Sequence, residues 1–204
     1  MSFLESLKNR RSIYALGRNV EVSDEAIIEL IQEAVRQSPS AFNSQSSRVV
    51  ILLDDQVTSF WNDLVAGDLE ATMKAQGVAD EAIAGTKEKL AGFASSKGTV
   101  LFFEDQDVIK GLQENFPLYA ENFPIWSEQS TGIASVNTWT ALSADLGLGA
   151  NLQHYNPVID DSVAKAYDIP KSWKLRGQLN FGSIEAPAGD KDYVEDSNRF
   201  KVFK

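Results

Sequence analysis

PIWSEQSTGIASVNTWTALSADLG, residues 124–147, is the stretch of sequence that decides the fold. Proline stands at a first helical position, where its missing N–H costs nothing, and Gly147 ends the pattern, so we predict one helix over residues 124–146. The positions between its large apolar side chains are mostly small: Gly132, Ala134, Ser135, Ala141, Ser143 and Ala144. Small residues let helices approach closely. We therefore expect this helix to be central, and a subunit interface is one place for it.

Continuous apolar runs elsewhere in the chain predict buried strands. These runs cover residues 49–53 and 99–103, and acidic residues end both. Residues 173–182 alternate apolar with other side chains, as a strand does. The remaining patterns predict helices over residues 2–9, 24–37, 56–76, 79–92 and 160–168, with the polar 79–92 helix facing solvent, and a helix-like stretch at 106–122 that Pro117 breaks.

This order of strands and helices, with no internal repeat or low-complexity linker, predicts a single α+β or α/β domain over residues 1–204 with a central sheet. The final segment, residues 198–204, alternates basic and apolar side chains. A free tail rarely retains Phe200, Val202 and Phe203. We expect this segment to form a strand that docks either on its own sheet or on a partner.

The composition excludes several classes of function. The 204 residues carry a formal net charge of −10, which argues against nucleic acid or an anionic membrane surface as the main partner. Without cysteine, thiolate catalysis and Cys-ligated metals are excluded, and a single histidine cannot build a histidine-rich metal site. No leader peptide or membrane-length apolar run is visible, so a cytoplasmic location is the default expectation. We expect the chemistry to come from a bound cofactor, with no metal.

Two basic clusters stand at opposite ends of this acidic chain. Arg10, Arg11 and Ser12 offer guanidinium and hydroxyl donors that suit a phosphate, and Arg199 and Lys201 lie near the C-terminus. A solvated basic helix end is the alternative interpretation of Arg10 and Arg11. If the clusters converge, they explain how an acidic protein holds an anionic ligand.

Other motifs are weaker on their own. Residues 38–48 form a polar loop in which Asn43 and Gln45 can bind one edge of a heterocycle, although an ordinary surface loop is the alternative. Gly147-Leu148-Gly149 lacks the third glycine of a dinucleotide fingerprint and follows a helix, so we interpret it as a helix stop. His154 has no visible orienting partner, so we interpret it as a contact residue. Several aromatic residues could stack on planar molecules, but we interpret them first as core: Trp61, Phe116, Tyr119, Phe123 and Trp126.

Taken together, these segments resemble the nitroreductase family of flavin enzymes. Arg10-Arg11-Ser12 resembles the family's N-terminal phosphate motif, and the pattern Ser38-Pro39-Ser40-x-x-Asn43-x-Gln45 resembles its flavin-ring loop. The small-residue helix followed by Leu152-Gln153-His154 resembles the stretch near the isoalloxazine. Arg199-x-Lys201 resembles the basic pair that returns to the phosphate. The four segments span almost the whole chain.

The resemblance implies a mainly antiparallel sheet flanked by helices, a long central helix at a homodimer interface and a swapped C-terminal strand. It implies FMN as the cofactor, reduced by NAD(P)H and oxidised by a nitroaromatic, quinone or similar small aromatic acceptor in a ping-pong cycle. Arg10, Ser12, Arg199 and Lys201 would hold the phosphate, with Arg11 beside them or on the ribityl chain. The remaining site residues would surround the ring: Ser38, Pro39 and Ser40 from the other subunit, Asn43 and Gln45 by hydrogen bonds, and Leu152, Gln153 and His154 near its reactive side. Flavin N5 would carry the hydride, so no catalytic side chain is expected.

The chain also departs from the family pattern. Ser46-Ser47-Arg48 follows Gln45 where many members have Pro-Trp, and Gln153-His154-Tyr155-Asn156 replaces an apolar-acidic-Gly run. These features resemble the branch of fungal nitroreductase-like proteins linked to lipid signalling and stress, and its bacterial relatives. The alternatives from the sequence are a flavin-binding regulatory or stress-response protein with little turnover, and a phosphate-ligand binding protein with no redox role.

Overall fold

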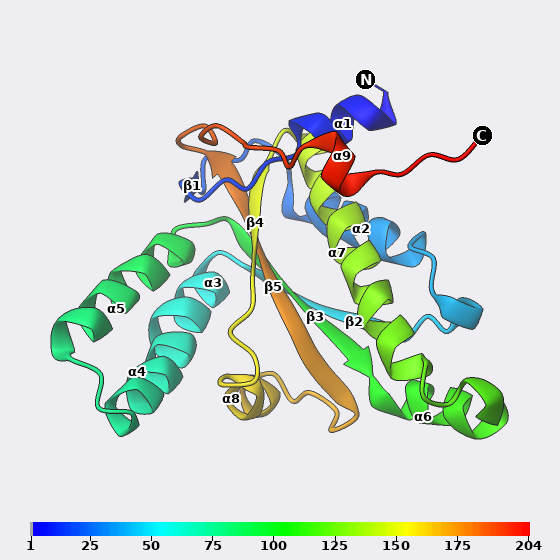
Figure 1. Ribbon diagram of the computed structural model, residues 1–204. Helices are drawn as coiled ribbons and strands as arrows, with labels where there is room; N and C mark the ends of the chain where they lie inside the picture. The colour runs from blue at the N-terminus through cyan, green and yellow to red at the C-terminus, as the bar shows by residue number, and fades with distance from the viewer. Residues whose placement is uncertain (1) are drawn as a thin grey trace.

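The protein is built on an antiparallel sheet with helices on both sides (Figure 1). A computed structural model describes residues 2–204. Strand β5 is central: β3 pairs along one edge, β4 and β1 pair along the other, and β2 pairs with the far edge of β3. The strands are β1 (Leu16–Gly17), β2 (Ser47–Leu53), β3 (Gly98–Asp105), β4 (Gly149–Gln153) and β5 (Trp173–Ile184). The predicted α+β class with a mainly antiparallel sheet is confirmed.

The helices form two groups, one on each face of the sheet. They are α1 (Phe3–Asn9), α2 (Asp24–Arg36), α3 (Asp55–Ser59), α4 (Ala66–Ala75), α5 (Asp80–Ala94), α6 (Gln106–Asn115), α7 (Phe123–Leu146), α8 (Asp160–Ala166) and α9 (Asp196–Arg199). A π-helical segment, Phe60–Val65, joins α3 to α4, and single 3-10 turns occupy Ala41–Asn43 and Pro117–Tyr119. Helices α2 and α7 pack on one face, and α3 to α5 with α8 pack on the other (Figure 1).

Strand β3 separates the two apolar cores because its side chains alternate between the faces. Val100 and Phe102 pack in the core under α2 and α7, whereas Leu101 and Phe103 pack in the core under α3 to α5 and α8. All four side chains are buried, as predicted for this strand. The alternation fixes α7 on one face of the sheet, where it borders both β3 and β4.

The helix predicted over residues 124–146 is α7, and its stop is the predicted one. Gly147 takes a left-handed conformation, with φ of 67°, that suits glycine, and the N–H of Leu148 donates to the carbonyl oxygen of Leu142 at 3.0 Å. The chain can therefore turn directly into β4. Strand β4 itself was not predicted, because the alternation of Ala150 and Leu152 with Gly149, Asn151 and Gln153 is short and follows the helix stop directly.

Three other predictions need correction. The strand predicted over 49–53 is not a buried one: β2 is an edge strand, and Leu52 alone is buried in it. The helix predicted over 56–76 is interrupted by the π-helical segment, which places Trp61 in the core. The helix predicted to face solvent over 79–92 is α5, which buries Ile83, Leu90 and Phe93, the last two in the core beside the sheet.

The C-terminal segment forms no strand within the described chain. Its regular element is the short helix α9, and residues 200–204 are exposed. The prediction that this segment docks on its own sheet is therefore wrong for the single chain. Docking on a partner stays a prediction.

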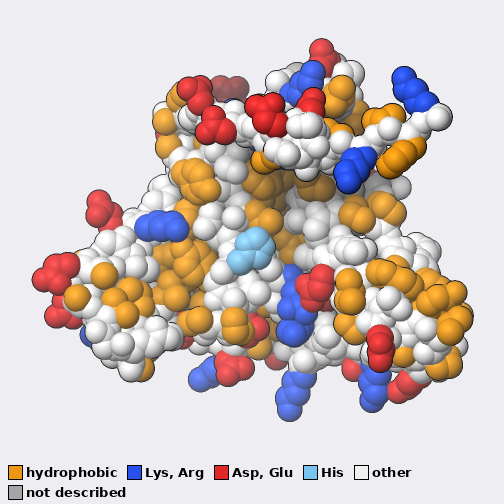
Figure 2. Space-filling model, viewed as in Figure 1, with side chains coloured by type: hydrophobic (Ala, Val, Ile, Leu, Met, Phe, Trp, Pro, Cys, Tyr) orange, Lys and Arg blue, Asp and Glu red, His pale blue; other side chains and the backbone are white. Residues whose placement is uncertain are grey.

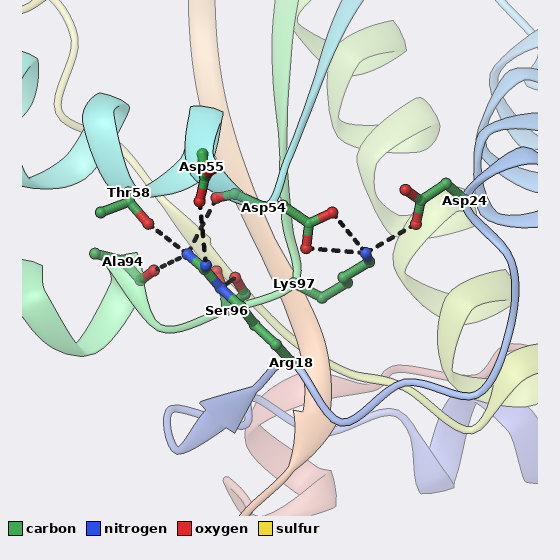
Figure 3. A network of polar contacts seen from close by, with 8 residues as sticks. All are labelled: Arg18, Asp24, Asp54, Asp55, Thr58, Ala94, Ser96 and Lys97. Atoms are coloured by element: carbon green, nitrogen blue, oxygen red, sulfur yellow. Dashed lines mark hydrogen bonds and ion pairs between the residues drawn. The ribbon is translucent and has the colours of Figure 1, made fainter.

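A network of hydrogen bonds and ion pairs joins several segments of the chain where β2 ends and β3 begins (Figure 3). Arg18 donates to the carbonyl oxygens of Asp54 at 3.0 Å and Ala94 at 2.9 Å. Lys97 bridges the carboxylates of Asp54 and Asp24, each with an oxygen at 2.8 Å. Desolvation opposes the charge of Lys97, but the two carboxylates outweigh it and raise its pKa. The network closes one end of the β2–β3 pair. The other end, at Glu104, borders the candidate site.

Candidate functional site

The Arg10-Arg11-Ser12 segment lies along the outer edge of β4. Helix α1 ends at Arg10, whose N–H donates to the carbonyl oxygen of Ser6. Ser12 forms a parallel bridge with Ala150, and the N–H of Ile13 donates to the carbonyl oxygen of Ala150 at 2.9 Å. Strand β4 then continues toward residues 152–154, and four residues of strand span about 13 Å. Two sequence segments that were far apart in the chain therefore belong to one edge of the sheet.

Buried amide side chains fix this edge from inside. Asn151 is fully buried, and its Nδ2 donates to the carbonyl oxygen of Ile13 at 2.8 Å. Its Oδ1 accepts from Gln153 at 2.8 Å and from Asn180 at 3.2 Å. The Oδ1 of Asn180 in turn accepts from the indole N–H of Trp61 at 2.9 Å. This network holds Gln153 by its amide and connects the arginine motif to the core.

A cavity of about 550 Å³ opens at the arginine motif. Arg10, Arg11, Ser12 and Tyr14 line one side, and residues 186–191 line the other, where Lys191 adds a third cation and Asp190 adds one acid. The C-terminal segment runs over this end of the molecule (Figures 1 and 2). The cavity has the donors and the charge that an anion needs.

The two arginines of the motif are held differently. The guanidinium of Arg10 lies 4.3 Å from the ring centre of Trp139 on α7, a cation–π contact that leaves its N–H edges available. Burial lowers the pKa of Arg10, and the neighbouring charge of Arg11 lowers it further. Arg11 donates from Nη2 to the carbonyl oxygen of Gly189 at 2.6 Å. Arg11 therefore fastens the C-terminal segment over the motif.

Arg199 and Lys201 do not join this cavity. Both side chains are exposed, and within residues 2–204 the guanidinium of Arg199 stacks on the adjacent Phe200, with 5.7 Å to the ring centre. The convergence of the two basic clusters is not formed in the single chain.

The loop of residues 38–45 lies on the side of α7 that faces α2. Ser38 accepts from Asn137 of α7 at 2.9 Å, and the N–H of Gln45 donates to the hydroxyl of Ser40 at 2.9 Å. A cavity of about 160 Å³ is lined here by Ser38, Pro39, Ser40 and Gln45 together with Ser47, Ser130 and Ala134. Asn43 is exposed and does not line it.

The backbone of this loop is strained. Phe42, Asn43 and Gln45 have φ of 56°, 51° and 46°, in the left-handed region that non-glycine residues rarely occupy. Such conformations persist where surrounding contacts over-determine them, and they concentrate at functional sites.

Leu152 and His154 line a different cavity, of about 310 Å³. Thr131, Gly132 and Ser135 of α7 form one wall, and Arg176, paired with Glu128, forms another. The Nε of Arg176 is buried without a hydrogen-bond partner among the described residues. Figure 2 shows His154, the pale blue side chain, exposed near the centre of the face that it displays. Gln153 does not line this cavity, because its amide is part of the buried network.

Helix α7 separates these two cavities. Ser130 and Ala134 line the cavity beside the loop, whereas Thr131 and Ser135 line the cavity beside Leu152. Consecutive helical residues point about 100° apart. The loop of one chain and the 152–154 stretch of the same chain therefore face different cavities.

Several candidate residues were not found from the sequence. Trp139 was interpreted only as part of the apolar side of a helix, and nothing local signals its contact with Arg10. Glu104 is one of the acids that end the predicted strand over residues 99–103, and an acid that directly continues a fully buried strand was a usable signal. Asn151 was invisible because β4 was not predicted.

Two further features are absent from residues 2–204. No helix there has both the length and the apolar character needed to cross a membrane. No cluster of three or more His, Asp or Glu residues in that range is arranged to hold a metal ion.

Comparison with known proteins places the chain in a family. The profile described as the nitroreductase family matches residues 7–183. HBN1 of Saccharomyces cerevisiae is 36% identical over 197 residues, which cover 96% of this chain and 94% of HBN1. The nitroreductase FRM2 of the same yeast is 32% identical over 200 residues, again covering 96% of this chain and 94% of FRM2.

A solved structure agrees over the full length. Nitroreductase CinD from Lactococcus lactis, solved in complex with chloramphenicol, is 59% identical, covers 100% of both chains and superposes with a TM-score of 0.91. CinD has also been solved with nicotinic acid and with 4-nitrophenol. From the family profile, the yeast relatives and this structure, we conclude that the chain belongs to the nitroreductase family.

Proposed function

We propose that this protein is an FMN-dependent oxidoreductase that oxidises NADH or NADPH and reduces nitroaromatics, quinones or similar acceptors in a ping-pong cycle. The observation that carries the proposal is one continuous edge of the sheet. It joins a cationic cavity at Arg10-Arg11-Ser12 to a second cavity at Leu152 and His154. An elongated ligand with an anionic end and a planar end fits that arrangement.

The donor set at the cationic end fits a phosphate. Arg10 is oriented by Trp139, Ser12 is fixed by its bridge to Ala150, and Lys191 adds charge. A cluster of cationic donors is unusual in a chain of net charge −10, and binding of a dianionic phosphate would account for it. Arg199 and Lys201 would complete the set if the C-terminal segment moved or came from a second chain.

The residues at the other end fit a planar heterocycle. Leu152 and Gly132 offer apolar surface, and His154, Ser135 and the free Nε of Arg176 offer polar contacts. FMN, when bound, would supply the hydride-accepting N5, so this chain needs no nucleophile of its own. Its residues would bind, orient and shield the ring.

A homodimer would bring the two halves of the site together. Since α7 separates the loop of residues 38–45 from the 152–154 stretch, each would complete a site with the other chain's counterpart. Helix α7 also leaves Ile125, Gln129, Gly132 and Val136 exposed at spacings of four, three and four residues, which is one face of a helix. The exposed apolar side chains of Ile125 and Val136 on this face favour a partner. Exposed Phe200, Val202 and Phe203 favour the same conclusion for the C-terminal segment.

An aromatic cluster offers a place for the acceptor. Phe42, Phe116, Tyr119, Phe123 and Trp126 contact one another, and a cavity of about 460 Å³ opens between Phe42 and Trp126. Stacking on such rings suits planar molecules. The CinD ligands, which include 4-nitrophenol, support this acceptor class. Trp61 is fully buried and takes no part.

The test is the colour of the purified protein and its response to reductant. We expect a yellow protein whose flavin bands bleach anaerobically with NADH or NADPH and return on adding a quinone or nitroaromatic. Arg10→Met should weaken FMN retention, whereas Lys89→Met, which removes a cation stacked on Phe93 away from the site, should leave it unchanged.

A colourless protein that takes up no added FMN contradicts the proposal. Arg10→Met and Lys201→Ala variants that both retain FMN like the wild type would refute the assigned phosphate site. Bound flavin that neither nicotinamide reduces would favour a regulatory role over turnover. A cytoplasmic location and a role in stress response stay predictions.

A further inference from the structure

Glu104 is a fully buried acid that the proposed function does not use. It lies near the end of β3, under α7, with none of its surface exposed to solvent. Its Oε2 accepts from the hydroxyl of Ser46 at 2.5 Å, and its Oε1 accepts from Ser47 at 2.6 Å and Thr131 at 2.7 Å. These distances lie in the range of hydroxyl groups that donate to a carboxylate.

No cation accompanies this carboxylate. Within residues 2–204, its side-chain partners are hydroxyl groups, and it belongs to no ion pair. Burying a charged group destabilises a protein unless hydrogen bonds within the protein replace those that the group made to water. The three hydroxyls satisfy it, and each of them is thereby fixed.

The partners of Glu104 belong to the two sides of the candidate site. Ser46 and Ser47 directly follow the strained loop, and Ser47 lines the cavity beside Ser40 and Gln45. Thr131 lines the cavity on the other side of α7. Glu104 therefore joins the end of the loop to the helix between the two cavities.

A second contact secures the same end of the loop from outside. Arg48 donates from Nη1 to the carbonyl oxygen of Gln45 at 2.6 Å and from Nη2 to Asp105 at 3.0 Å. Asp105 is the residue after Glu104. Glu104 and Asp105, two neighbouring acids of β3, thus hold the loop directly after its three left-handed residues. A strained backbone persists only where surrounding contacts support it in this way.

We propose that Glu104 is a positioning residue, whose carboxylate fixes the backbone of residues 38–45 so that Ser40 and Gln45 face their cavity. The inference rests on the proposed function in one respect, namely that this cavity takes part in binding FMN. Glu104 acts through Ser46 and touches no ligand, because both side chains are fully buried.

The test uses Glu104→Gln and Ser46→Ala in the full-length protein. Each substitution weakens the hydrogen bonds of Glu104 that hold the end of the loop, without altering a surface that a ligand could reach. We expect the Kd of FMN, measured by quenching of flavin fluorescence, to rise about tenfold, the effect of losing one charge-assisted hydrogen bond. Amide hydrogen exchange over residues 40–46 should become faster, because the N–H of Gln45 depends on the position of Ser40.

The control is Lys97→Met, at the opposite end of the β2–β3 pair (Figure 3). This substitution removes the ion pairs of Lys97 with Asp24 and Asp54. It should lower the melting temperature without changing the Kd of FMN or the hydrogen exchange over residues 40–46. Unchanged Kd in both Glu104→Gln and Ser46→Ala, or an equal change in Lys97→Met, would overturn the inference. If the wild type takes up no flavin, the proposed function fails, and the exchange measurement alone decides whether Glu104 holds the loop.

Discussion

Replacing Asn151 by leucine should destabilise the protein by about 2–6 kcal/mol, because the change leaves two buried polar groups without partners. The carbonyl oxygen of Ile13 loses a donor at 2.8 Å, and Nδ2 of Asn180 loses an acceptor at 3.2 Å. Each such group costs about 1–3 kcal/mol when it is buried and unsatisfied. Gln153 is only half-buried, so its freed amide can reach water and adds less. The sum is a large share of the roughly 5–15 kcal/mol that holds a typical domain folded.

The assay is urea denaturation followed by tryptophan fluorescence, since Trp61 belongs to the same network. Asn137→Leu is the matched control: it removes one hydrogen bond, to Ser38 at 2.9 Å, from a half-buried position and should cost about 1 kcal/mol. The Asn151 variant should also bind inorganic phosphate more weakly, because Ile13 follows the arginine motif directly. If Asn151→Leu costs no more than Asn137→Leu, the network does not fix this edge of the sheet.

The remaining predictions concern packing and pH. Gly182→Ala should destabilise by at least ~2 kcal/mol, because its Cβ would lie 2.2 Å from the carbonyl oxygen of Gly17, a backbone atom that cannot move aside. Gly85→Ala in α5 meets open space and should stabilise by about 0.5–1 kcal/mol; thermal melts of the two variants that shifted in the same direction would contradict this reading. Burial raises the pKa of Asp160, and the charges of Arg176 and Lys174 only partly offset this effect. The native state therefore takes up a proton more readily than the unfolded chain. Stability consequently falls as pH rises from the pKa of Asp160 in the unfolded chain through its higher pKa in the native state. Asp160→Asn should therefore melt at a higher temperature than the wild type at pH 7, and the difference should close below the ordinary aspartate pKa of about 3.9; a constant difference would exclude titration of Asp160 as its cause.

The sequence predicts elements well where one physical signal is strong and local. The length of α7 follows from proline at its start and Gly147 at its end, and β3 follows from an unbroken apolar run. Strand β2 has a similar run, yet it lies at an edge, because pairing order is a property of the whole sheet. Strand β4 has only a weak local signal, the short alternation of Ala150 and Leu152 with their neighbours. Its residues become a strand because β5 offers a free edge and Asn151 finds buried partners there.

The site was predicted less completely than the fold. The structure groups Arg10, Arg11 and Ser12 in one cavity, and it groups Ser38, Pro39, Ser40 and Gln45 in another. Asn43, Arg199 and Lys201 line neither cavity. Arg199 and Lys201 lie in the exposed C-terminal segment, and Asn43 is an exposed residue of the strained loop. The residues that we propose orient the site were missed because their roles depend on contacts between distant segments, as with Glu104 and Ser46, which are 58 residues apart.

Helix α7 keeps the cavity beside the loop apart from the cavity beside β4. Its small residues let the loop approach one side and β4 approach the other, so Ser130 and Thr131, adjacent in sequence, serve different cavities. A helix that was large and apolar on both sides could not border two polar cavities at van der Waals distance. The same helix keeps Ile125, Gln129, Gly132 and Val136 exposed. The composition that first marked residues 124–146 as central thus has two consequences: it makes room for a ligand on either side, and it leaves a surface on which a second α7 could bring the complementary halves together.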